Sequence, residues 1–290
     1  MNQKEQELLL ETRFLRPGAI AEAAQRRELR STSAETRRLL IVAADHTARG
    51  MLDVGTNQTA MANRYDLLDR LVSALDIPGV DGVLGTPDII EDLMLLGALD
   101  QKYVFGSMNR GGLPGAVFEM DDRFTGYTVE SIVESRLDGG KMLLRINLED
   151  AGTANTLESC AKAVTKLAAA DRIAMLEPFM SHHVDGRIQH DLTAAGVIRS
   201  MAVASALGAT SSHTWLKVPV VDEMERVAEA TTMPLVLLGG PRSDRPDEMF
   251  EQWEKTLRLP GVRGLVVGRN LLYPPDDDVA TAVKTAVSLL

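Results

Sequence analysis

Eight short apolar runs, each ending at a polar or glycine-rich turn, recur along most of this 290-residue sequence. Segments with helical periodicity separate most of the runs, so strand and helix signals alternate from residue 39 to the C-terminus. Runs that are apolar throughout are typical of parallel strands buried on both faces. Eight strand–helix units predict an α/β protein with the (β/α)8 TIM-barrel fold. A doubly wound sheet is the alternative, although such a sheet usually has fewer units.

The runs and helical segments define the expected element order. The runs are LLIVAADH, VDGVLGTP, KYVFGSMN, KMLLRINLED, RIAMLEPF, HTWLKVPV, MPLVLLGG and VRGLVVGRN, which begin at residues 39, 80, 102, 141, 172, 213, 233 and 262. Helices are expected at 64–76, 87–99, 155–170, 193–208 and 222–231. The connection from Ser107 to Tyr127 is too long for an ordinary turn, so it predicts an active-site loop or lid.

The first 38 residues lie outside this repeat. Apolar and charged positions alternate with helical spacing from Lys4 to Arg30, with an interruption at the sequence RPG (residues 16–18). Because proline and glycine disfavour helix interiors, we expect two helices there. The predicted organisation is an N-terminal helical extension over 1–38, followed by a barrel domain over 39–290.

Composition excludes several classes of function. A net charge of −10 should repel nucleic acid and anionic membranes, and aromatic residues, at 4%, provide no stacking platform for bases. The single cysteine, Cys160, allows no intrachain disulfide and suits a reducing compartment. No apolar run approaches the roughly 20 residues of a membrane span, and the first ten residues lack the order of a signal peptide. We therefore expect a cytoplasmic protein with no nucleic-acid or membrane partner.

A lysine in the sixth run, Lys217, is the first candidate for chemistry. A buried ammonium group must be paired or lose its proton. One interpretation is structural: the lysine pairs with a carboxylate or extends to the barrel rim. The other is catalytic: desolvation and a nearby cation keep the amine neutral, so that it attacks a ketone or aldehyde and forms a Schiff base. Lys141, at the start of the fourth run, is the candidate cation, unless it is a surface lysine of the preceding DGG turn.

Other polar side chains stand near the carboxyl ends of the runs, where barrels place their functional residues. Asp45 ends the first run and Glu177 stands in the fifth. Each would either pair with a lysine or transfer protons, and the sequence does not separate these roles. Arg145 and Asn147, in the fourth run, are candidate substrate-binding residues.

Glycines end the last two runs. Gly239 and Gly240 end the seventh run, and Gly268 lies near the end of the eighth. Glycine leaves backbone N–H groups accessible, and barrels bind phosphate at these two strands, where a short helix N-terminus adds its dipole. Arg242 and Arg269 would add charged donors. Ordinary turn glycines are the alternative, but together the two sites predict a phosphorylated small-molecule substrate.

The five histidines form no recognisable zinc pattern. His182 and His183 are adjacent and would point in different directions, and no H-x-H or H-E-x-x-H motif occurs. We therefore predict no metal and no other cofactor.

Four motifs resemble the DeoC/LacD superfamily of class I aldolases: AADH in the first run, LKVPV in the sixth, GGP in the seventh and VGRN in the eighth. This superfamily includes DhnA-type fructose-bisphosphate aldolases, tagatose-bisphosphate aldolases and deoxyribose-phosphate aldolases. The resemblance runs from about residue 39 to the end of the chain. It implies a (β/α)8 barrel that works without a metal and acts on a phosphorylated sugar.

The resemblance also implies roles for individual residues. Lys217 matches the Schiff-base lysine, Asp45 matches the aspartate of the first strand, and Lys141 resembles the second lysine of the tagatose-type enzymes. The residues that match the phosphate loops are Gly239, Gly240, Gly268 and Arg269.

Two features depart from the DhnA-type pattern. Glu177 stands in LEPF, where those enzymes often have a tyrosine, and Val218 and Pro219 follow the lysine in place of the usual K-T or K-x-E.

The segment 109–126 resembles a loop of an actinobacterial subgroup found with inositol catabolism. That resemblance implies cleavage of 2-deoxy-5-keto-gluconate 6-phosphate. We also expect a homo-oligomer.

Three hypotheses remain open at this point. The first is a class I aldolase that cleaves a phosphorylated keto sugar or sugar acid. The second is a thiolase-like acyl transferase or an isomerase of a phosphorylated ketose, which would keep the lysine but give other products. The third is a non-catalytic barrel that binds sugar phosphates and needs no reactive amine.

Overall fold

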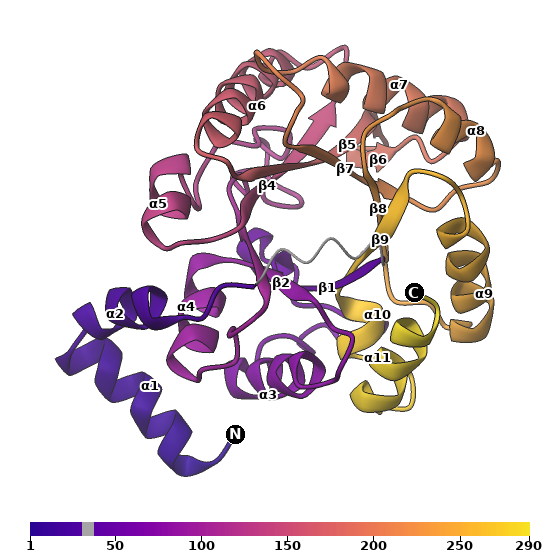
Figure 1. Cartoon of the computed structure of the whole chain (residues 1–290). Coiled ribbons are helices and arrows are strands. Elements are labelled where there is room, and N and C mark those ends of the chain that lie inside the picture. Colours follow the sequence, from indigo (N-terminus) through magenta and orange to yellow (C-terminus); the bar gives the residue numbers. More distant parts are fainter. Residues whose placement is uncertain (31–37) are drawn as a thin grey trace.

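Eight parallel strands close into a barrel that helices surround (Figure 1). The computed structural model describes residues 1–30 and 38–290. The barrel strands are β1 (Leu39–Ala43), β2 (Gly82–Gly85), β3 (Tyr103–Ser107), β4 (Gly139–Ile146), β5 (Ile173–Val184), β7 (Thr214–Pro219), β8 (Leu235–Leu238) and β9 (Val262–Val267). They pair in the order β4-β3-β2-β1-β9-β8-β7-β5, and pairing between β4 and β5 closes the ring. The predicted (β/α)8 TIM-barrel fold is confirmed.

Helices connect the strands on the outside of the barrel. They are η1 (His46–Arg49, a 3-10 helix), α3 (Arg64–Leu75), α4 (Pro87–Leu95), α5 (Val129–Glu134), α6 (Gly152–Ala169), α7 (Ala194–Ser205), α8 (Met224–Glu229), α9 (Pro246–Leu257), α10 (Arg269–Leu272) and α11 (Val279–Ser288). The five predicted helices correspond to α3, α4, α6, α7 and α8. The second of them ends four residues early, because Gly97 (φ 70°) adopts the left-handed conformation that terminates helices.

A β-hairpin extends from the barrel at the end of β5. The last third of β5, residues 181–184, pairs antiparallel with β6 (Arg187–His190). Asp185 and Gly186 both have positive φ angles, 49° and 73°, as tight two-residue hairpin turns require. The predicted run ended at residue 179, so this hairpin is an addition to the prediction. The Asp-Gly turn signal in the sequence would have indicated it.

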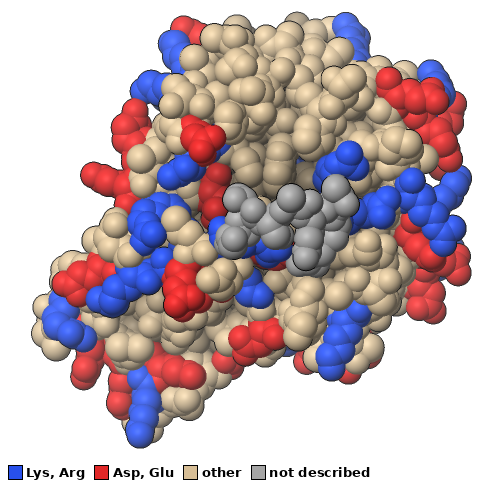
Figure 2. Space-filling view, viewed as in Figure 1, with Lys and Arg blue, Asp and Glu red and all other residues tan. Residues whose placement is uncertain are grey.

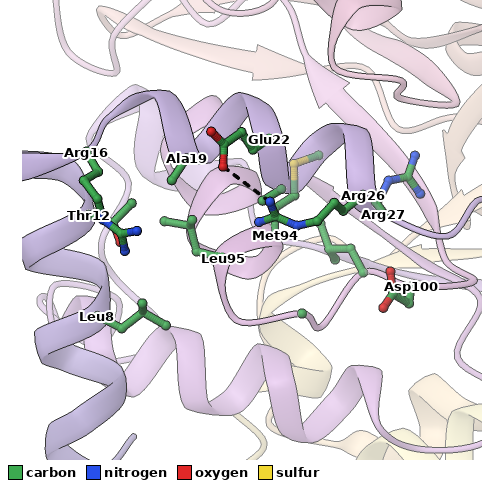
Figure 3. A pocket seen from close by; sticks show the side chains of 13 residues that line it. Leu8, Thr12, Arg16, Ala19, Glu22, Arg26, Arg27, Met94, Leu95 and Asp100 are labelled. Carbon is green, nitrogen blue, oxygen red and sulfur yellow. Dashed lines mark hydrogen bonds and ion pairs between the residues drawn. The ribbon is translucent and has the colours of Figure 1, made fainter.

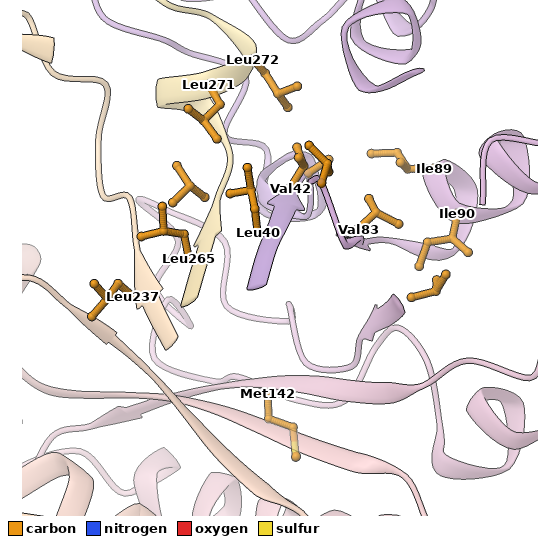
Figure 4. Close-up of a cluster of buried hydrophobic side chains, with 14 of the residues drawn as sticks. Leu40, Val42, Val83, Ile89, Ile90, Met142, Leu237, Leu265, Leu271 and Leu272 are labelled. Carbon is orange, nitrogen blue, oxygen red and sulfur yellow. The ribbon is translucent and has the colours of Figure 1, made fainter. Parts of the chain in front are cut away.

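Alternate residues along each strand face two separate apolar cores. Outward-facing residues such as Leu40 and Val42 pack beneath the helices in the larger core (Figure 4). Ile41 and Ala43, between and after them, belong to a smaller cluster inside the barrel. That inner cluster consists of Ile41, Ala43, Leu84, Phe105, Met175, Val236 and Val266. Burial of both strand faces explains why the runs are apolar throughout.

Two N-terminal helices lie outside the ring (Figure 1). These are α1 (Gln3–Leu15) and α2 (Gly18–Arg26), so the predicted interruption at residues 16–18 is confirmed. Helix α2 contacts α4, and a cavity of about 410 Å³ lies among α1, α2 and α4 (Figure 3). Phe14 on α1 is 87% exposed. The expected homo-oligomer stays a prediction.

Charged side chains of both signs are interspersed around the face seen in Figure 2. Acidic side chains lie beside basic ones over much of its edge, in keeping with the overall charge of −10. Among the helices of residues 1–30 and 38–290, none combines the length and the apolar character that crossing a membrane requires.

Leu265→Ala should destabilise the fold strongly. Leu265 lies on β9, fully buried between the barrel and its helices (Figure 4). Removing its side chain loses apolar burial and leaves a cavity, so we expect a loss of about 2–5 kcal/mol in the free energy of unfolding. Urea denaturation followed by circular dichroism measures this loss. The matched control is Leu10→Ala on the exposed side of α1, where the change should stay within about 0.5 kcal/mol.

Candidate active site

Alternation along the strands brings five polar side chains together inside the barrel. Lys141 on β4 lies in register with Ser107 on β3 and Met175 on β5. Met175 belongs to the inner apolar cluster, so Glu177, two residues further along β5, faces the same interior. By the same alternation, Lys217 lies two residues after Trp215 on β7, and Asp45 lies two residues after Ala43, the last residue of β1. The side chains brought together in this way are Asp45, Ser107, Lys141, Glu177 and Lys217.

The carboxylate of Glu177 bridges two lysines. Lys217 Nζ donates a hydrogen bond to Glu177 Oε1 over 2.8 Å. Lys141 Nζ forms an ion pair with the other oxygen, Glu177 Oε2. Both lysines predicted from the sequence therefore meet at one carboxylate. Lys141 is a fully buried strand residue rather than a surface lysine of the preceding turn.

Asp45 is held through a single oxygen atom. Its Oδ2 accepts from Ser107 Oγ (3.1 Å), from Lys141 Nζ (3.3 Å), and from both Nε (2.9 Å) and Nη2 of Arg110. Within the described part of the chain, Asp45 Oδ1 has no hydrogen-bond partner. Arg110 is a residue that the sequence analysis missed. The available signal was its position three residues beyond the end of β3, at the start of the long loop.

Burial and neighbouring charges together set the protonation states. Burial and the cation of Arg110 lower the pKa of Lys141 to about 8. Burial alone would raise the pKa of Glu177, but Lys141 and Lys217 outweigh it, so that this pKa lies below its usual value. Burial would likewise raise the pKa of Asp45, but Arg110 and Lys141 hold it well below the usual range. Both carboxylates are therefore ionised at neutral pH.

A cavity of about 680 Å³ opens at this network. Lys217, Glu177 and Arg110 line it, whereas Lys141 and Asp45 are completely buried and are not part of its wall. The two lysines thus differ in access: one amine reaches the cavity and the other does not. Apolar side chains form much of the remaining wall, among them Met51, Leu143, Phe179, Leu238, Met249 and Trp253.

The glycine loops after β8 and β9 form another part of the wall. Gly239, Gly240, Gly268 and Arg269 all line the cavity, and their predicted role in binding phosphate stays a prediction. Gly240 has a φ of 65°, which favours glycine. A side chain at Gly268 would place its Cβ 2.1 Å from the carbonyl oxygen of Ala43. Glycine therefore lets the loop after β9 approach the end of β1.

Asn270 ties these two loops together. Its Nδ2 donates to the carbonyl oxygens of Gly239 (2.7 Å) and Pro241 (3.1 Å), and its Oδ1 accepts from the backbone N–H of Ser243 (2.7 Å). Asn270 is buried, and the sequence analysis did not select it as a site residue. The only signal for it in the sequence was its place in the VGRN motif. Its hydrogen-bond partners lie on the loop after β8, whereas Asn270 itself follows β9.

Three predicted binding residues do not line the cavity. Arg242 pairs with Asp244 (Nη2–Oδ1, 2.7 Å). The Oδ1 of Asn147 accepts from the backbone N–H of Glu149 (3.0 Å), which shapes the turn after β4. Arg145 donates its hydrogen bonds to residues of the long loop between β3 and α5. Their proximity in sequence to the strand ends did not specify the direction of their side chains.

Arg145 instead anchors the long loop between β3 and α5. It donates to both oxygens of Asp122, from Nε (2.8 Å) and Nη2 (2.7 Å), and to the carbonyl oxygen of Glu119. Arg49 donates from Nε to the carbonyl oxygen of Gly112 (2.7 Å). Two arginines of the barrel side thus hold the loop whose Arg110 lines the cavity.

Two histidines also line the cavity, although the sequence analysis assigned them no role. His190, on the hairpin, stacks on Phe179 with ring centroids 4.3 Å apart, and a hydrogen bond of 2.9 Å joins its Nδ1 to Ser181 Oγ. Burial lowers the pKa of His190 to about 4 and that of His46 to about 3, so both are neutral at pH 7. No group of three or more His, Cys, Asp or Glu side chains in the described ranges is arranged to hold a metal ion.

Comparison with known proteins places the chain in a family. A family model described as Cgl0159-like matches residues 37–287. The chain belongs to the Cgl0159-like family. The crystal structure of Cgl0159 from Corynebacterium glutamicum shares 58% sequence identity with it, superposes with a TM-score of 0.97, and matches over 100% of this chain and 97% of the other.

Other known proteins that are similar to this Cgl0159-like protein carry aldolase or synthase names. An archaeal fructose-1,6-bisphosphate aldolase, whose catalytic lysine is covalently bound to a carbinolamine intermediate, has a TM-score of 0.63 and 16% identity over 93% of this chain and 98% of its own. A 2-amino-4,5-dihydroxy-6-oxo-7-(phosphonooxy)heptanoate synthase from Streptomyces griseus is 28% identical over 82% of this chain and 80% of its own. The expected resemblance to class I aldolases is confirmed for the fold.

Arg145→Met should loosen the loop of this Cgl0159-like protein and destabilise the protein. The substitution leaves Asp122 completely buried without its guanidinium partner, and breaking one side of a buried ion pair costs about 3–5 kcal/mol. Urea denaturation should show that loss, and limited proteolysis should show faster cleavage within 111–121. Arg123→Met is the matched control, since Arg123 is an exposed residue of the same loop. Equal stability of the two variants would contradict the assigned role of Arg145.

Proposed function

We propose that this Cgl0159-like protein is a class I aldolase that cleaves a phosphorylated keto sugar or sugar acid, with Lys217 as the Schiff-base lysine. The observation that carries the proposal is the position of Lys217: its amine lies in the cavity wall and donates to an ionised carboxylate. Lys141 binds the same carboxylate but is sealed from the cavity. Access therefore favours Lys217 as the nucleophile and Lys141 as the neighbouring basic group.

Imine formation requires a neutral amine and a base beside it. Glu177, hydrogen-bonded to Lys217, is the carboxylate placed to relay the proton that Lys217 loses to the hydroxyl that leaves as water. The free amine then attacks the carbonyl carbon of the substrate, and the resulting carbinolamine loses water to give a protonated imine.

Cleavage uses the imine as an electron sink. A carboxylate removes the proton from the substrate hydroxyl, the carbon–carbon bond breaks, and its electron pair enters the imine to leave an enamine on Lys217. The departing fragment is an aldehyde. Glu177 is the better placed carboxylate because it lines the cavity, whereas Asp45 does not. Protonation and hydrolysis of the enamine then return the free lysine.

Charge in the cavity supports an anionic substrate. Its wall carries one carboxylate, Glu177, and four basic side chains, Arg49, Arg110, Lys217 and Arg269, of which Arg110 is already paired with Asp45. The glycine loops beside Arg269 offer backbone donors to a phosphate. The Streptomyces relative is named for a phosphonooxy oxo acid, in keeping with this charge. We propose 2-deoxy-5-keto-gluconate 6-phosphate and fructose 1,6-bisphosphate as the first substrates to assay.

Borohydride reduction in the presence of substrate should add mass irreversibly at Lys217. Reduction converts the imine to a stable amine, and peptide mass spectrometry locates the adduct. Lys217→Ala should abolish both the adduct and cleavage. Lys255→Ala, which removes an exposed lysine of α9, should keep both.

Analysis of the products separates this proposal from its rivals. Two carbon fragments support an aldolase, whereas an isomer or an acyl thioester would support one of the other lysine chemistries. An adduct of equal yield in the Lys217→Ala variant would refute the assignment of the nucleophile.

Arg269→Met should weaken substrate binding through the phosphate group. Loss of one charge-assisted hydrogen bond costs about 1.5–3 kcal/mol, which predicts a KM roughly 10- to 100-fold higher for a phosphorylated substrate. Steady-state kinetics measure this change. Arg242→Met is the matched control, because Arg242 belongs to the neighbouring loop but does not line the cavity, and its KM should change less than about threefold. Similar values for the two variants would place the phosphate elsewhere.

A further inference from the structure

The long loop between β3 and α5 delivers one side chain directly to the charged network. Arg110 is 9% exposed and places both Nε and Nη2 on Asp45 Oδ2. It lines the large cavity and also a second cavity of about 510 Å³. Arg110 therefore borders both cavities.

The backbone on either side of Arg110 is fixed. The side chain of Asn109 exchanges two hydrogen bonds of 2.6 Å with the backbone of Leu143 on β4, one through Nδ2 and one through Oδ1. On the other side, a Cβ at Gly112 would lie 2.0 Å from the carbonyl oxygen of Glu119, so the loop packs closely on itself. The position of Arg110 is thus determined by the barrel and by the loop together.

We propose that Arg110 is a positioning residue of the reaction centre: it clamps the Asp45 carboxylate against Lys141 and keeps a permanent positive charge beside that lysine. The β3–α5 loop then contributes a side chain to the reaction centre, in addition to covering it. This role goes beyond the residues of the proposed aldolase chemistry, and its effect on turnover rests on that proposed function.

Charges from four elements act on Lys141. Asp45, after β1, and Glu177, on β5, favour its protonated form, while Arg110 from the loop and Lys217 from β7 oppose it. Ser107, the neighbour on β3, is uncharged. Among these charges Arg110 has the largest effect on the pKa of Lys141, which burial and this cation lower to about 8. Without Arg110, the ammonium form of Lys141 is less disfavoured, so its pKa must rise.

The sign of the effect gives a direct test that needs no substrate. In protein with 13C-labelled lysine, the Cε signal of Lys141, assigned by its loss in Lys141→Arg, should titrate near 8. In Arg110→Met the midpoint should rise by roughly 1 or more, because the variant loses a like charge that is held on the same carboxylate oxygen as Lys141. Arg110→Lys keeps a cation and should restore at least half of the difference. Arg123→Met, in the exposed part of the same loop, should leave the midpoint unchanged.

Turnover provides the second measurement. With a substrate that the native protein cleaves, Arg110→Met should lower kcat roughly 10-fold or more while KM changes less than about threefold, because Arg110 acts through Asp45 and Lys141. A purely structural role would lower thermal stability and leave the Lys141 midpoint near 8. That result, or a midpoint within about 0.3 of the native value in a folded Arg110→Met protein, would overturn the proposal.

Asn109→Ala provides a second test of the role of Arg110. If Arg110→Met does not fold, Asn109→Ala retains the arginine but frees its backbone, and the midpoint should rise by a smaller amount in proportion to the displaced charge. If native protein forms no borohydride adduct, the aldolase proposal fails, yet the lysine titration still decides the role of Arg110.

Discussion

A carboxylate shared by two lysines inside a barrel is the interaction on which the site depends. An isolated buried charge is costly, so charges in such a place must compensate one another. Here Glu177 joins Lys217 to Lys141, and Asp45 joins Lys141 to Arg110. The series contains three basic and two acidic side chains, so basic groups outnumber acidic ones beside the cavity. That excess suits a substrate with a negative group.

The barrel makes this arrangement possible because parallel strands present their carboxyl ends on one side. The apolar cluster inside the barrel, which includes Phe105 and Met175, lies on the same strand faces as the charged network. Its residues fill the barrel and keep water from the buried charges. Trp215, two residues before Lys217, packs its ring against Phe105 with centroids 5.7 Å apart. Strand alternation thus stacks an apolar layer and a charged layer on the same elements.

Loops complete the site because buried side chains hold them in place. Asn270 links the glycine loops after β8 and β9, and Arg145 holds the β3–α5 loop through Asp122. Neither residue lines the cavity. Each satisfies the hydrogen-bonding groups of a loop that would otherwise be costly to bury. The shape of the cavity therefore depends on residues that need never contact the substrate.

Local patterns in the sequence determined the fold and part of the site. Apolar runs and helical periodicity specified the strand–helix units, because a strand that is buried on both faces is apolar at nearly every position. Lys217, Glu177, Lys141 and Asp45 stood out because a charge within or at the end of an apolar run needs a partner. Tertiary structure alone decided which partners they have, since the contacts join strands far apart in the chain. It alone directed Arg145 into the long loop and Arg110 onto Asp45. Both contacts depend on how the β3–α5 loop packs, and the sequence of that loop has no periodic pattern from which its packing could be predicted.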